Sequence, residues 1–131
     1  MPVVSVYAAL LTLLFIALSV RTIRLRRRLR IAIGDADHIE MRRAMRVHAN
    51  FAEYVPLALL LIYLTEISGA PVLLVHALGI SLLVGRVAHA YGVSQVDENF
   101  RFRVFGMVMT FGTLGVCSAY LLARYAMKMA G

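Results

Sequence analysis

The sequence predicts an all-α protein, a four-helix transmembrane bundle that forms a single domain over residues 1–131. Hydrophobic residues make up 61% of the chain, against about 45–50% in an ordinary soluble domain. They fall into four apolar stretches, residues 3–20, 47–67, 72–91 and 104–125. Each stretch is close to the roughly 20 residues that a helix needs to cross the hydrocarbon core. Four such spans leave no room for a soluble catalytic domain.

The first helix is expected over residues 3–30, where the apolar stretch runs directly into a series of arginines. A cleaved signal peptide has its basic residues before the apolar region, whereas here they follow it. This order is typical of an uncleaved helix with its N-terminus outside the cytoplasm and its basic loop inside. The break in the helix is predicted at residues 34–37, which include Gly34 and two aspartates.

The second helix is expected over residues 38–67. Asp37 is its predicted N-cap, and Glu40 follows three residues later, as in a capping box. Pro56 lies in the helix interior, where it removes one backbone hydrogen bond. In a membrane bundle, neighbouring helices can satisfy the carbonyl group that this proline frees.

The third and fourth helices are expected over residues 72–91 and 101–127, after a short turn at residues 68–71. The polar, acidic residues 93–99 are predicted to form the loop between them. Three glycines lie along the fourth helix: Gly106, Gly112 and Gly115. Small residues of this kind let membrane helices approach one another closely.

The formal net charge is +7, and most of the arginines follow the first apolar stretch. Short arginine-rich loops stay in the cytoplasm, and arginines beside a membrane also contact anionic lipid. We therefore expect membrane lipid rather than nucleic acid as a partner, with both chain termini on the non-cytoplasmic side.

Polar side chains interrupt the start of the second apolar stretch. Arg43, Arg46, Asn50 and Glu53 are three or four residues apart and so share one helix face, with Tyr54 at its margin. Charged and amide groups inside a membrane helix are costly, so they either join helices or form a functional site. From this face alone, a clasp between helices and a ligand site are equally favoured.

The other helices bring further donors to the same depth. Such a group would suit a small polar anion held by arginines. Its members are Arg21 and Arg24 at the end of the first helix, Arg86, His89 and Tyr91 at the end of the third, and Arg101 and Arg103 at the start of the fourth. The four histidines show no metal-ligand spacing, and Cys117 is the single cysteine, so no metal site is expected.

The run from Arg46 to Pro56 resembles the signature of the MAPEG family, the membrane-associated proteins of eicosanoid and glutathione metabolism. The family pattern is close to Arg-x-x-x-Asn-x-x-Glu-Tyr/Asn-x-Pro. Here Arg46, Asn50, Glu53 and Tyr54 occupy it together with that proline. The four helices, the long basic first loop and the short second loop also agree. The chain looks most like the short bacterial members, which implies an inner-membrane location.

The resemblance implies a homotrimer in which glutathione, a co-substrate, binds between subunits near the cytoplasmic face. Matching contacts would be Arg46, Asn50, Glu53 and Tyr54, and His48 falls where some members have a contacting glutamine. Arg86 matches an arginine of the third-helix motif. The leukotriene-forming members have tyrosines where this chain has His89 and Val93, and Tyr91 lies between these two positions.

The resemblance also places a thiol-activating arginine at the start of the fourth helix, which would be Arg103 or, failing that, Arg101. These are two residues apart, so one should face the cleft between subunits and the other the headgroups or the loop at residues 97–98. The implied function is a glutathione-dependent transferase or peroxidase for a hydrophobic electrophile or lipid hydroperoxide. The alternative is a non-catalytic lipid- or glutathione-binding protein of this fold. A transporter or channel subunit would need a continuous polar path across the membrane, whereas the polar face of the second helix ends near Tyr54.

Overall fold

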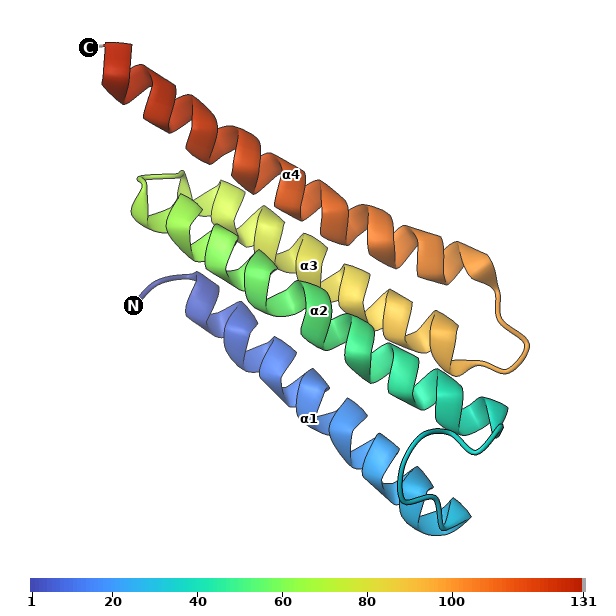
Figure 1. Ribbon diagram of the computed structural model, residues 1–131. Coiled ribbons are helices and arrows are strands. Elements are labelled where there is room, and N and C mark those ends of the chain that lie inside the picture. The colour runs from blue at the N-terminus through green and yellow to red at the C-terminus, as the bar shows by residue number, and fades with distance from the viewer. Residues whose placement is uncertain (131) are drawn as a thin grey trace.

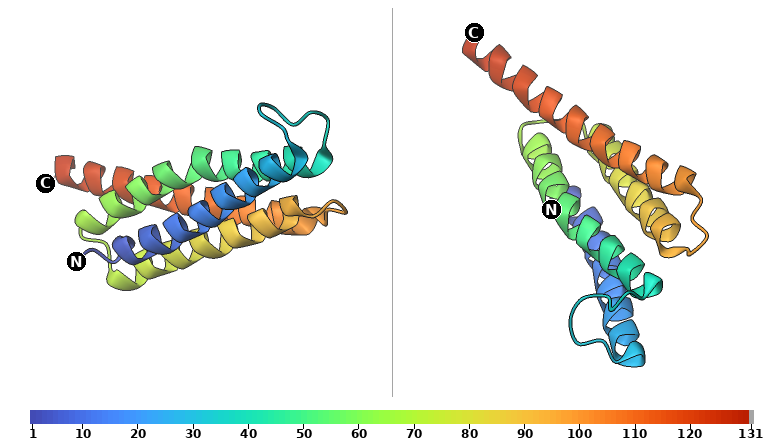
Figure 2. Two further views of the ribbon diagram at one scale, coloured as in Figure 1. Left: turned by 90° about the horizontal axis from the view of Figure 1, so that it is seen from below. Right: turned by 45° about the vertical axis from the view of Figure 1, so that its right-hand side comes forward.

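The computed structural model describes residues 1–130, which form α1 (Val4–Leu29), α2 (Ile39–Ile67), α3 (Val72–Ser94) and α4 (Phe100–Ala130). Each of these helices is long and apolar enough to cross a membrane. They lie side by side, and the N- and C-termini are at the same end of the bundle (Figures 1 and 2). The predicted all-α, four-helix transmembrane architecture is confirmed.

The helix boundaries differ modestly from those predicted. α1 continues through the arginine run as expected and ends at Arg30, which has the left-handed φ of 55°. α3 extends three residues past its predicted end at Tyr91, so that the connection to α4 is shorter than the polar segment suggested. α2 shows no break at Pro56.

The predicted N-cap of α2 is wrong. The helix starts after His38, which makes no capping hydrogen bond through its side chain. Asp37 has φ 60°, whereas a capping residue takes an extended conformation. Its carboxylate instead accepts a hydrogen bond from Arg42 Nη2 at 3.1 Å. Arg42 also binds Asp35 and thereby lowers the pKa of that carboxyl. The two aspartates of this loop therefore pair with Arg42 and do not cap the helix.

At the opposite end of the bundle, Glu66 joins α2 to α1. Its carboxylate accepts hydrogen bonds from the backbone N–H groups of Val3 and Val4, the latter at 2.9 Å. These groups have no partner within the helix, and the partial positive charge of a helix N-terminus favours an anion there. Glu66 therefore supplies from another helix the cap that α1 lacks in its own sequence.

The backbones of α3 and α4 approach closely at Gly106. A Cβ atom on Gly106 would lie 2.5 Å from the carbonyl oxygen of Gly85 and 2.8 Å from the backbone nitrogen of His89. The prediction of close approach at small residues is thus correct for Gly106. Gly112 and Gly115 face open space within this protomer, and the C-terminal end of α4 extends beyond the α2–α3 turn (Figure 1).

We expect Gly106→Ala to lower the free energy of unfolding by about 1–3 kcal/mol, because the added methyl group meets rigid backbone atoms. Gly112→Ala places the same methyl group in open space on the same helix, and alanine favours a helix over glycine by about 0.8–1.0 kcal/mol. Unfolding in mixed micelles, titrated with a denaturing detergent, would measure both. Equal destabilisation by the two substitutions would contradict the close contact at Gly106.

Candidate functional site

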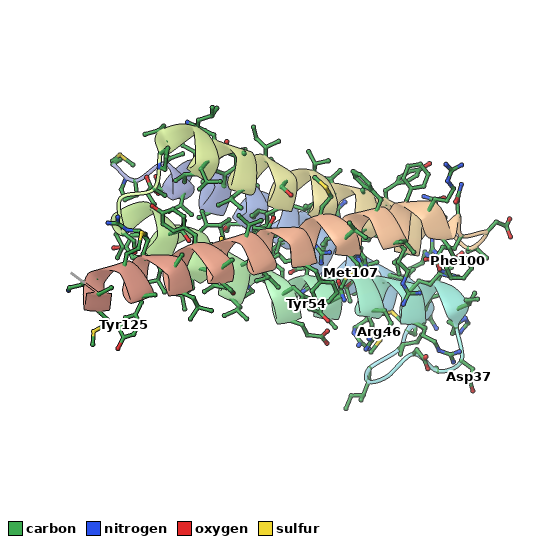
Figure 3. All side chains as sticks on the ribbon, turned by 90° about the horizontal axis from the view of Figure 1, so that it is seen from above. Asp37, Arg46, Tyr54, Phe100, Met107 and Tyr125 are labelled. Atoms are coloured by element: carbon green, nitrogen blue, oxygen red, sulfur yellow. The ribbon has the colours of Figure 1, made fainter. Side chains whose placement is uncertain are left out.

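The polar face of α2 lies beside the N-terminal half of α4. Tyr54 is half-buried, and its ring packs edge-on against Phe111 of α4 with 5.5 Å between centroids. Figure 3 shows Arg46 and Tyr54 on this part of α2, with Met107 of α4 close by. The face is therefore bordered by α4 on one side and is open on the other.

Arg46 and Glu53 are the exposed members of this face. Within residues 1–130, neither side chain has a hydrogen bond or an ion pair. They lie seven residues apart, about 10 Å along the helix axis. Both charges are therefore available to a ligand or to a neighbouring subunit.

Asn50 lies between those two charges and contacts the buried guanidinium of Arg86. Arg86 is 1% exposed. Its Nη1 donates to Asn50 Oδ1 at 2.8 Å, and its Nη2 donates to the carbonyl oxygen of Gly106 at 3.3 Å. The contact ties α2, α3 and α4 together. The helix-clasp interpretation thus describes Asn50, whereas Arg46 and Glu53 have no such role within the chain.

This geometry also separates Arg86 from the open surface. Its Nη2 lies 3.4 Å from the sulfur of Met107, and its Nε is buried without a partner among the described residues. The enclosed guanidinium holds Asn50 by its side-chain oxygen. The amino group of Asn50 then remains as a free donor.

Three further candidate residues do not converge on the open face of α2. His48 points toward α1, with Nε2 at 3.0 Å from Ser19 Oγ and its ring stacked on Phe15. His89 is buried where α3 meets Gly106. Tyr91 is exposed, and its ring meets Phe102 with 5.3 Å between centroids.

The candidate thiol-activating arginines begin α4, and both are exposed. Nη1 of Arg103 lies 3.9 Å from Oε1 of Glu98, whose other oxygen accepts a hydrogen bond at 2.9 Å from Arg43. The side chain of Glu98 is only 5% exposed. Arg101 has no side-chain partner within the part of the chain described. Arg103 is therefore the arginine that faces the loop.

Glu98 is the residue at this end of the bundle that sequence reasoning undervalued. It lies between arginines of α2 and α4, and Arg43 also donates to the carbonyl oxygen of Val93 at 3.1 Å. Glu98 is an acidic residue in the loop next to two helix ends that carry arginines, and this pattern could have predicted an ion pair. The network fixes the end of α3 and the start of α4 relative to α2.

Comparison with known proteins agrees with this architecture. The model of the MAPEG family matches residues 4–123. The chain is 40% identical over 110 residues to the protein named inner membrane protein YecN of Escherichia coli strain K12. The aligned region covers 84% of this chain and 82% of that protein. The protein of the same name from E. coli O6:H1 strain CFT073 gives the same values. Since the family match spans nearly the whole chain and these relatives align over most of their length, the protein belongs to the MAPEG family.

Proposed function

We propose that the protein is a glutathione-dependent transferase or peroxidase of the bacterial inner membrane, acting on a hydrophobic electrophile or lipid hydroperoxide. The observation that carries the proposal is the exposed pair Arg46 and Glu53, opposite charges on one face of α2 without hydrogen-bond or ion-pair partners among the described residues. Family membership supports glutathione as the ligand, and the E. coli relatives, which are named inner membrane proteins, support the location.

The charges of glutathione suit this face. At neutral pH the tripeptide carries two carboxylates and one ammonium group around a neutral thiol. The guanidinium of Arg46 is a fork-shaped partner for a carboxylate, and Glu53 is a partner for the ammonium. The free amino group of Asn50, oriented by Arg86, lies between them as a further donor. Tyr54 completes the set at the margin toward α4.

A homotrimer would supply the remaining walls. The face of α2 is open within one protomer, and Arg46 and Glu53 are accessible to a neighbouring copy. A cleft between subunits would enclose the tripeptide and exclude water, which strengthens the charge-assisted contacts. His48 packs against α1 of its own chain and is not one of the contacts at this face.

The chemistry begins with the glutathione thiol. A free thiol has a pKa of about 8.5 and is only a few per cent thiolate at pH 7. A guanidinium beside the sulfur stabilises the thiolate, so the proton passes to solvent more readily. Arginine stays protonated and acts through its charge. We assign this role to Arg103, which would have to turn from Glu98, 3.9 Å away, toward the sulfur. Failing that, the role falls to Arg101, whose side chain has no partner among the described residues.

The thiolate then attacks a substrate that arrives from the bilayer. With an organic halide, the sulfur–carbon bond forms as the carbon–halogen bond breaks, and halide leaves with the electron pair. With a lipid hydroperoxide, the sulfur takes the terminal oxygen and the O–O bond breaks, so that the alkoxide gains a proton and becomes an alcohol. A second glutathione reduces the resulting sulfenic acid and gives the disulfide and water.

We expect Arg103→Ala to raise the titration midpoint of bound glutathione by about 1–3 pH units, the usual effect of losing one opposite charge nearby. The ultraviolet absorbance of the thiolate, followed across pH on the complex, measures this midpoint. Arg27→Ala removes an exposed arginine of α1 and serves as the control. If Arg103→Ala and Arg101→Ala both keep the wild-type midpoint, thiolate activation by the start of α4 is refuted.

The second candidate is a non-catalytic glutathione- or lipid-binding protein of the same fold. The approach of Arg103 to Glu98 favours it, because a carboxylate nearby offsets the charge that would otherwise act on a thiolate. Purified protein incubated with glutathione and a chromogenic aryl halide separates the two candidates. Conjugation above the uncatalysed rate supports the enzyme. If the protein binds glutathione but neither conjugates the aryl halide nor reduces a lipid hydroperoxide, the non-catalytic candidate is supported.

A further inference from the structure

A groove of about 790 Å³ runs along the outside of α1 and ends against the last residues of α3. Its floor on α1 has two chemically different halves. Leu13, Ile16 and Val20 are exposed and apolar, and Arg21, Arg24 and Arg28 follow on the same helix face at spacings of three and four residues. Neither Arg46 nor Glu53 lines this groove, so it is separate from the proposed glutathione contacts within the protomer.

The two halves follow the depth of one membrane leaflet. The apolar half from Leu13 to Val20 is about 10 Å long at the rise of an α-helix, which lies within the roughly 15 Å of one leaflet's hydrocarbon. The arginines begin one residue later, so with the apolar half in the hydrocarbon they would reach the phosphate headgroups. An amphiphile that lies along α1 would thus meet apolar side chains with its tail and arginines with its headgroup.

The charges in the groove are not equally available. Arg28 forms an ion pair with Glu40 at 2.6 Å, so its charge is already offset. Arg21 donates a hydrogen bond to Ser94 Oγ, which directs its guanidinium across the groove toward the end of α3. Arg24 is exposed and has no side-chain partner within residues 1–130. The arginine half of the groove therefore presents two guanidinium groups, those of Arg21 and Arg24, without a countercharge.

We propose that this groove is a binding site for one anionic glycerophospholipid. Arg21 and Arg24 hold the phosphate, since arginine recognises phosphate through paired N–H donors. One acyl chain lies over Leu13, Ile16 and Val20 and covers apolar surface that the protein leaves exposed. A soluble phosphate ester would gain only the first of these contacts, and a zwitterionic lipid would gain mainly the second.

Native mass spectrometry of the protein in detergent tests this, with phosphatidylglycerol, phosphatidylcholine of the same chains and glycerol 3-phosphate as probes. Phosphatidylglycerol should bind most tightly. Arg24→Gln should weaken it about fivefold, which corresponds to the contribution of one arginine at an anionic membrane surface. Arg27→Gln is the matched control, since it removes another exposed arginine of the same helix that does not line the groove.

A second pair of variants probes the apolar half. Ala17 lines the groove and is exposed, whereas Ala9 is exposed on α1 outside it. Ala17→Trp should displace the lipid, and Ala9→Trp should leave its affinity unchanged. Equal effects of Arg24→Gln and Arg27→Gln would overturn the site in favour of diffuse attraction. Equal binding of the two lipids, or binding of glycerol 3-phosphate as tight as that of phosphatidylglycerol, would also overturn it.

Discussion

Glu53→Gln and Arg46→Ala are each expected to weaken glutathione binding by about 30-fold to several thousand-fold. Removing one partner of a desolvated charge pair costs about 2–5 kcal/mol, and each 1.4 kcal/mol corresponds to tenfold in affinity. Both side chains are exposed and form no hydrogen bond or ion pair within residues 1–130, so their loss breaks no polar contact there. The variants should therefore fold normally. Calorimetry on the detergent-solubilised protein then measures the change in glutathione affinity.

The sequence offers matched controls for both substitutions. Asp97→Asn neutralises an exposed carboxylate outside this face of α2, and Arg27→Ala removes an exposed arginine of α1. Neither should change the affinity more than about twofold, the scale of weak surface electrostatics. Unchanged affinity in Glu53→Gln and Arg46→Ala would refute the ligand site. If the two variants also dissociated the oligomer, the partners of these charges would be residues of a neighbouring subunit.

The helices could be predicted because length and apolar composition are local properties of the chain. The start of α2 could not, since the backbone of the loop decided it. Asp37 has the residue type and the spacing of an N-cap, but its left-handed conformation and its bond to Arg42 turn the carboxylate elsewhere. A capping pattern shows that a suitable side chain is available. It does not determine whether the backbone adopts the extended conformation that an N-cap requires.

The candidate site shows the same limit at the level of packing. Helical spacing placed Arg46, Asn50 and Glu53 on one face of α2, and the structure has them on that helix. Spacing on one helix carries no information on which neighbour covers it. The burial of Arg86 against Asn50 depends on how closely α3 approaches α4 at Gly106, and the direction of His48 depends on where α1 packs.

Asn50 should therefore be replaceable by an acid but not by an apolar residue. Asn50→Leu removes the acceptor of Arg86 Nη1 and should cost about 1.5–3 kcal/mol of unfolding free energy, the range for a hydrogen bond to a charged group. Asn50→Asp keeps the shape and places a carboxylate on the guanidinium. Arg86 has no acidic partner among the described residues, so Asn50→Asp should retain the wild-type stability or exceed it.

Detergent-titrated unfolding of the two variants measures this difference, and Asn50→Leu combined with Arg86→Met shows its origin. If the cost in Asn50→Leu is the buried guanidinium left without its acceptor, removing that guanidinium as well should recover part of the lost stability. Stability that falls equally in Asn50→Leu and Asn50→Asp would mean that the amide's shape, rather than its bond to Arg86, holds the helices together. The buried arginine would then need another source of compensation, since a cation 1% exposed among three helices is not stabilised by solvent.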